Sequence, residues 1–160
     1  MSAHAAGGPA GSGGGTGGFT VLELLFTMAI VAILAVIALP VYSKFIQKAR
    51  ETAVISYLSK LVKAEELYYL GSPTASYTGD FDELETTGLI TPSTGASTRI
   101  EHEYTFSLSS GTSGGKPVWQ VTAAPVDGST SARWFYADQS GILRFETGTT
   151  ASAASPQVQN

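Results

Sequence analysis

The feature that most constrains this chain is an apolar run from Phe19 to Val41 that holds a single ionisable side chain, Glu23. Its length of about 23 residues, at ~1.5 Å per residue in a helix, is enough to cross a bilayer core of ~30 Å. A carboxylate in such a segment costs on the order of 3 kcal/mol near the bilayer centre and less near an end. The run offers Glu23 no cation. We therefore expect a membrane-spanning helix whose one acid needs a partner from elsewhere.

Such a partner would arise if the chain were cut between Gly18 and Phe19, because the new α-amino group would lie a few residues from Glu23. The stretch GFTVLE from Gly18 to Glu23, followed by the apolar helix, resembles the class III signal of type IV pilins and pseudopilins. The resemblance is close over residues 18 to about 42 and looser beyond them. It implies that residues 1–18 are a leader, that a membrane-embedded aspartic prepilin peptidase cuts after Gly18, and that Phe19 becomes N-methylated.

The resemblance also implies a life cycle. The precursor lies in the inner membrane as a single-pass protein with its C-terminal domain in the periplasm, in contact with lipid through residues 19–41. The pilus assembly machinery then extracts subunits into a helical homopolymer at the cell surface, which serves adhesion, motility or DNA uptake. Phe19, Glu23 and Pro40 are the residues that it assigns to filament assembly. Glu23 would neutralise the amino terminus of Phe19 on a neighbouring subunit, and the helix would loosen at Pro40, which removes one backbone hydrogen bond.

The chain departs from the usual pilin pattern at both ends of the span. The leader is rich in Gly, Ala and Ser and has no Lys or Arg, whereas pilin leaders usually carry a basic residue near the cut. Lys44, Lys48 and Arg50 follow the span. The positive-inside rule alone would therefore place the C-terminal part in the cytoplasm. We follow the resemblance, which implies the reverse orientation.

Downstream, the sequence predicts an α+β fold. Residues 19–71 read as one long helix, whose part beyond Val41 is amphipathic and ends at Gly71 and Pro73. Residues 72–97 read as a loop with a short helix at about 81–87, introduced by a capping box. The apolar positions of the amphipathic part are Tyr42, Phe45, Ile46, Ala49, Ala53, Tyr57, Leu61, Ala64 and Tyr68.

The loop contains an acidic cluster, formed by Asp80, Asp82, Glu83 and Glu85. Carboxylates are the ligands that calcium prefers. The spacing fails the EF-hand pattern, because Leu84 stands where further ligand and glycine positions would be needed. We therefore interpret the cluster as helix capping and a solvated face, and expect neither a metal nor another cofactor.

Residues 98–147 predict four antiparallel strands packed on the second half of the long helix, the arrangement of a pilin head. The first runs from Ile100 to Leu108 and would bury His102, because its residues alternate in polarity. The others are expected at 118–122, 133–137 and 142–146, with a turn at 109–115 and a buried Trp119 or Trp134. Residues 148–160 read as a flexible tail.

Composition narrows the function further. The chain has no cysteine and a formal net charge of −4, so a disulfide is impossible and no basic footprint for nucleic acid exists. The parts for nucleophilic, zinc or nucleotide chemistry are missing, and we do not expect an enzyme. A pseudopilin of a type II secretion system stays an alternative, although the isolated Asp127 and Asp138 do not suggest its calcium site. A membrane-anchored domain that never polymerises is a further alternative.

Overall fold

The computed structural model describes residues 18–91 and 97–159. The chain divides into two compact units, Met1–Val41 and Tyr42–Asn160, and the first helix contributes to both. The class is α+β, as predicted, with five strands in place of four. In chain order the elements are α1 (Val21–Gly71), α2 (Phe81–Thr86), β1 (Thr98–Glu101), β2 (Tyr104–Ser113), β3 (Lys116–Pro125), β4 (Arg133–Asp138) and β5 (Arg144–Thr147).

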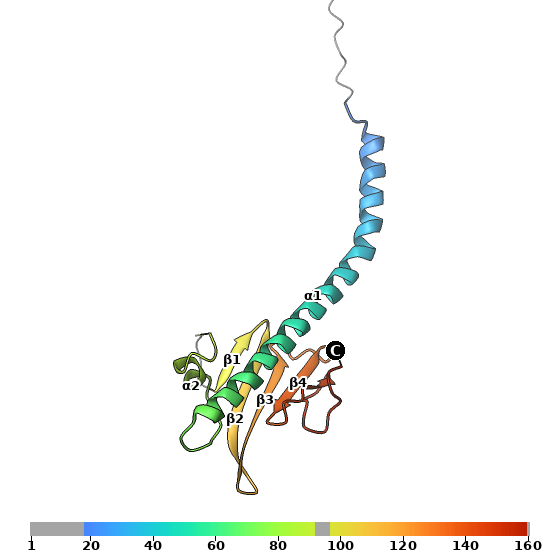
Figure 1. Cartoon of the computed structure of the whole chain (residues 1–160). Helices are drawn as coiled ribbons and strands as arrows, with labels where there is room; N and C mark the ends of the chain where they lie inside the picture. The colour runs from blue at the N-terminus through green and yellow to red at the C-terminus, as the bar shows by residue number, and fades with distance from the viewer. Residues whose placement is uncertain (1–17, 92–96, 160) are drawn as a thin grey trace, which may run out of the picture. The chain divides into compact units, whose positions relative to one another are not determined.

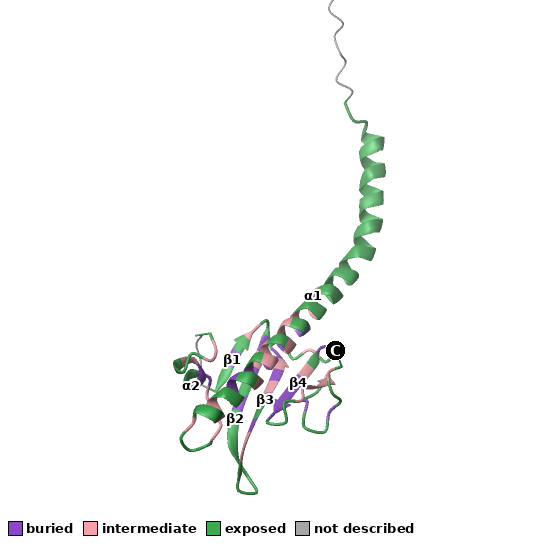
Figure 2. Cartoon of the chain, in the orientation of Figure 1, coloured by how far each residue is buried: buried purple, intermediate pink, exposed green. Residues whose placement is uncertain are grey.

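The described part of the first unit is helical from Val21 onward. Thr20 caps the helix: its Oγ1 accepts a hydrogen bond from the backbone N–H of Glu23 at 3.2 Å, and its carbonyl accepts one from Leu24 at 3.2 Å. The helix continues through Pro40. Every residue from 18 to 41 is exposed, as the green ribbon of Figure 2 shows. A helix that is apolar all round needs lipid or other helices around it.

In the second unit the five strands form an antiparallel meander in the order β1-β2-β3-β4-β5, and α1 crosses one face of this sheet (Figure 1). The helix buries one stripe against the sheet. Its buried apolar residues are Val54, Leu58, Leu61 and Ala64. The predicted stripe is off by one position in its middle, because Val54 and Leu58 are fully buried while Ala53 and Tyr57 are only partly buried. Its first members, Tyr42 and Phe45, are exposed.

The register of the sheet aligns inward-facing residues in rows. One row crosses all five strands and consists of Arg99, Phe106, Ala123, Phe135 and Phe145. The three middle members belong to the core under α1, and Phe145 packs against it. An arginine therefore occupies the β1 end of an otherwise apolar row.

The predicted first strand is in fact a hairpin, and the prediction of a buried His102 was wrong. His102 and Glu103 both have positive φ, 53° and 62°, and Glu101 pairs directly with Tyr104. Two residues with positive φ between paired strands form a type I′ turn, which reverses the chain. His102 is consequently exposed, and Ile100 is 64% exposed instead of facing the core.

The next hairpin is longer than predicted. The turn expected over residues 109–115 is confined to Gly114 and Gly115, whose φ values are 58° and 78°. The residues before it continue β2 as far as Ser113, which pairs with Lys116. Glycine is favoured at both turn positions because it adopts positive φ without steric cost.

The segment after β5, which we expected to be flexible, lies along that strand. The N–H of Phe145 donates to the carbonyl of Pro156 at 2.9 Å, and the N–H of Val158 donates to the carbonyl of Leu143 at 2.8 Å. Ala151 in the same segment is buried. Ordinary small residues in this stretch gave no hydrophobic pattern from which the contact could be predicted.

The short helix α2 agrees with its predicted position, and Asp80 caps it by accepting from the N–H of Asp82 at 2.9 Å. The other half of the predicted capping box is not formed. Glu83 instead accepts from the hydroxyl of Thr78 at 2.6 Å, and the same hydroxyl oxygen accepts from the N–H of Asp80 at 3.1 Å. The Thr78 hydroxyl therefore bridges the backbone N–H of Asp80 and the carboxylate of Glu83.

Candidate functional site

The predicted cleavage point lies in an open part of the chain. Gly18, Phe19 and Thr20 precede the helix and adopt no regular secondary structure. Phe19 is 80% exposed, and no atom of the described residues lies within 4 Å of the position that a Cβ on Gly18 would occupy. Within the described part of the chain, both residues that flank the Gly18–Phe19 bond are exposed.

Glu23 lies two residues after Val21, in the first turn of α1. Its N–H is satisfied by Thr20, and a carboxylate in this turn interacts favourably with the helix dipole, by about 0.3–1 kcal/mol at an exposed site. The carboxylate has no ion pair among the residues that the structure describes. Sequence reasoning overlooked the cap, although Thr20 and Glu23 have the Thr-x-x-Glu spacing of a capping box.

Pro40 does not belong to the same site. It follows Glu23 by 17 positions in one continuous helix, which corresponds to about 25 Å along the axis. The three residues assigned to assembly therefore lie at two levels of α1: Phe19 with Glu23 at its start, and Pro40 close to the end of the apolar run.

Between these two levels α1 presents a continuous apolar surface. Within the described chain it is the one helix long and apolar enough to cross a membrane. Its large exposed apolar side chains up to Val41 are Val21, Leu22, Leu24, Leu25, Phe26, Met28, Ile30, Val31, Ile33, Leu34, Val36, Ile37, Leu39 and Val41. Each of them is 49–79% exposed within the described chain, and the helix is a candidate membrane span by its length and composition.

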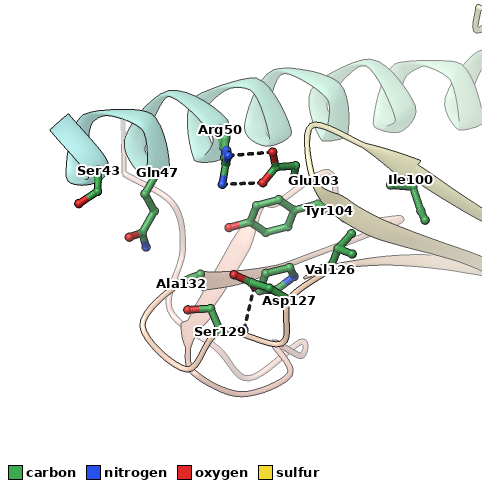
Figure 3. A pocket seen from close by; sticks show the side chains of 11 residues that line it. Ser43, Gln47, Arg50, Ile100, Glu103, Tyr104, Val126, Asp127, Ser129 and Ala132 are labelled. Atoms are coloured by element: carbon green, nitrogen blue, oxygen red, sulfur yellow. Dashed lines mark hydrogen bonds and ion pairs between the residues drawn. The ribbon is translucent and has the colours of Figure 1, made fainter. Parts of the chain in front are cut away.

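The second unit has a hollow between α1 and the β1–β2 turn (Figure 3). Arg50 from α1 and Glu103 from the turn line this hollow and contact each other directly, at 2.6 and 2.7 Å. Tyr104 lies beside this pair and donates to the carbonyl of Arg133 at 3.0 Å; burial raises the pKa of Tyr104 to about 12. Because the Arg50–Glu103 pair is exposed, it contributes about 0–1 kcal/mol. Its role in this geometry is to hold the β1–β2 turn to α1.

Arg99 is a buried charge that sequence reasoning placed on the polar face of its strand. It is 2% exposed. Its guanidinium donates to the Tyr57 hydroxyl at 2.6 Å and to the Thr91 carbonyl at 3.0 Å, forms an ion pair with Glu85, and lies 5.5 Å from the centre of the Phe81 ring. One side chain thus joins α1, α2 and β1. The burial of Arg99 follows from the β1–β2 register, which pairs Arg99 with Phe106. The alternation of polar and apolar residues in the sequence predicts the opposite face for Arg99.

Three of the four acids in the cluster before and within α2 have separate partners. Asp80 caps α2, Glu83 accepts from Thr78, and Glu85 pairs with Arg99. Asp127 and Asp138 each accept from a backbone N–H two residues later, at 3.0 and 2.9 Å. Among the described residues no three His, Cys, Asp or Glu side chains gather in a way that could hold a metal ion.

No protein-family model, no curated protein and no solved structure matches this chain. An assignment of function therefore rests on the residues and contacts described above.

Proposed function

We propose that this protein is the structural subunit of a type IV pilus. In this proposal the precursor is inserted in the inner membrane through α1, with the second unit in the periplasm. A prepilin peptidase cleaves it after Gly18, and the mature chain polymerises through α1 into a surface filament. The observation that carries the proposal is a helix start whose acid, Glu23, has no ion pair among the described residues and which follows an exposed Gly18 and Phe19.

The charges give the physical reason for assembly. Cleavage leaves a cationic amino group on Phe19, a few residues from the anionic Glu23. Both groups would be enclosed where apolar helices exclude water, and an unpaired buried charge is strongly destabilising. Pairing the amino group of one subunit with Glu23 of another removes both liabilities and sets the axial register between neighbouring helices.

A second candidate, a membrane-anchored domain that does not polymerise, is supported by the cap at the helix start. Glu23 lies in the first turn, where the helix dipole favours a carboxylate, and an acid near the end of a span costs less than one at its centre. In that case Glu23 needs no partner subunit. The two candidates differ in what removal of the carboxylate does.

The test is Glu23→Ala in the full chain, with filaments counted in sheared surface fractions. If Glu23 is an assembly contact, its loss leaves the amino group of Phe19 unpaired at a cost of about 3–5 kcal/mol per subunit, and filaments should disappear. Cleavage after Gly18 and the amount of protein in the membrane should stay nearly unchanged. Glu66→Ala removes an exposed acid from the C-terminal part of α1 and serves as the matched control.

Normal filament yield from Glu23→Ala would support the anchor instead. Processing is checked separately by mass spectrometry of the surface protein, which should begin at Phe19 and carry a methyl group. Gly18→Val should block this maturation, because the peptidase must accept a residue without a side chain there. A surface chain that still begins at Met1 contradicts the proposal, and filaments that serve protein export instead of appearing at the surface would favour the pseudopilin.

A further inference from the structure

The stretch of α1 just after the apolar run carries cations only. Lys44, Lys48 and Arg50 come before the first acid, Glu51. Lys44 and Lys48 are one helical turn apart and therefore lie on the same face. Arg50 is paired with Glu103, whereas neither lysine has an ion pair within the described ranges. Two exposed ammonium groups on one face of α1 thus have no acidic partner in the part of the chain that the structure describes.

These two lysines line a shallow hollow whose other wall comes from the sheet. Arg133 at the start of β4 belongs to it, as do Ser131 and Thr147. The guanidinium of Arg133 lies 4.7 Å from the centre of the Phe145 ring and 3.6 Å from a carboxylate oxygen of Glu51.

Glu51 is the one acid that lines this hollow, and its side chain is nearly buried. Besides Arg133, its Oε1 accepts from the Gln47 amide at 3.2 Å. The negative charge is therefore already engaged within the protein. With three cations and one acid, the hollow has a formal charge of +2 (3 − 1 = 2), in a chain whose formal net charge is −4.

We propose that this hollow binds the phosphate of an anionic phospholipid, through Lys44 and Lys48, before the subunit leaves the membrane. The inference rests on the membrane insertion in the proposed function. Along the helix, Lys44 follows Val41 by about 4.5 Å and Lys48 follows it by about 10 Å. The headgroup layer extends for about 5–7 Å beyond each side of the hydrocarbon core, so Lys44 lies at headgroup depth and the Lys48 side chain can reach that layer.

The location of the two lysines favours an anionic lipid over a nucleic acid. A nucleic-acid surface needs an extended basic stripe, whereas only two unpaired lysines are present here. Anionic headgroups attract basic residues immediately next to a membrane span, and the attraction falls off within a Debye length. The proposal also gives these cations a role on the side where the positive-inside rule does not expect them.

Native mass spectrometry of the full chain in neutral detergent tests this directly. The chain is titrated with phosphatidylglycerol, with phosphatidylcholine of the same acyl chains, and with inorganic phosphate. Phosphatidylglycerol adducts should form at lower concentration than phosphatidylcholine adducts. Lys44→Gln combined with Lys48→Gln should weaken phosphatidylglycerol binding about thirtyfold, to the level of phosphatidylcholine. Both lysines are exposed, so thermal unfolding of the double variant should match that of the wild type.

Lys60→Gln combined with Lys63→Gln is the matched control, because it makes the same change in charge on the same helix, away from the span. Equal affinity for the two lipids, or an equal loss in both double variants, would overturn the inference. Displacement of phosphatidylglycerol by millimolar inorganic phosphate would also overturn it, since the site would then take a free anion. Failure of the wild-type chain to float with vesicles contradicts the proposed function itself, and filament yield is measured independently.

Discussion

The buried carboxylate of Glu65 accepts a hydrogen bond from the backbone N–H of Thr78 at 3.2 Å, which joins α1 to the loop before α2. Glu65 is 0% exposed, and its Oε1 has no hydrogen-bond partner among the described residues. Burial, together with the nearby charge of Glu83 and against the Thr78 hydrogen bond, raises the pKa of Glu65 to about 8. The carboxyl group is therefore protonated inside the core at neutral pH.

This relationship predicts a pH dependence of stability. The ordinary pKa of the carboxyl is 4.5 and the folded value is about 8, so the folded state binds the proton more tightly. The contribution of Glu65 is full below pH ~4.5 and is lost as pH rises through 8, at about 1.4 kcal/mol per pH unit. Urea unfolding of the full chain in detergent between pH 5 and 9 should show this slope up to about pH 8 and a flattening above it. Glu65→Gln should remove it and Glu66→Gln should keep it; an unchanged slope in Glu65→Gln would contradict the assignment.

Arg99 should be indispensable to the fold. Arg99→Ala removes a buried guanidinium together with its ion pair to Glu85 and its hydrogen bonds to Tyr57 and Thr91, so we expect a loss of about 3–5 kcal/mol in the free energy of unfolding. Arg50→Ala breaks the exposed pair with Glu103 and should cost at most about 1 kcal/mol. Equal effects of the two substitutions in urea unfolding would show that Arg99 is not a structural charge.

The two tryptophans should differ in their contributions to stability. Trp119 is 3% exposed and belongs to the core, so Trp119→Ala should cost about 3–5 kcal/mol. Trp134 is only half-buried, so Trp134→Ala should cost clearly less. Thermal unfolding followed by circular dichroism compares them. A larger effect at Trp134 would mean that the core is centred elsewhere.

Gly148 is held by its surroundings as well as by its backbone. Its φ is +76°, and an added Cβ would lie 2.5 Å from the carbonyl oxygen of Thr130, which belongs to the backbone and cannot easily move. Gly88 has a similar φ of +74°, and no atom of the described residues lies within 4 Å of its Cβ position. Gly88→Ala should therefore cost only the left-handed strain of about 1–2 kcal/mol, and Gly148→Ala should cost more. Equal shifts in the unfolding midpoint would show that the segment moves to accommodate the methyl group.

The elements with a strong local signal were predictable from the sequence. The apolar run indicates where α1 begins, Gly71 marks its end, and Asp80 marks the start of α2. Each of these signals depends on a short stretch of sequence and needs no contact with distant residues. The β1–β2 hairpin was not predictable in this way. His102 and Glu103, which adopt positive φ, are not typical turn residues. The alternation of polar and apolar residues also continues across them, so the sequence predicts one uninterrupted strand.

The candidate site shows the same division. Gly18, Phe19 and Glu23 form a local motif, so their places at the helix start could be predicted. The buried charges could not, because Arg99 and Glu65 acquire their partners only when the hairpin register and the loop before α2 bring distant residues together. Nor does the sequence reveal that Arg133 joins Lys44 and Lys48, since 85 positions separate Lys48 from it (133 − 48 = 85).

The contacts of the segment after β5 have a consequence for how the second unit folds. It is fastened to the sheet by backbone hydrogen bonds from Phe145 and Val158, in a chain that has no cysteine. Closing the end of a domain with a disulfide requires an oxidising compartment and an electron acceptor. Docking of the segment after β5 needs neither a thiol oxidase nor a disulfide isomerase. It should therefore proceed at the same rate in reducing and in oxidising surroundings.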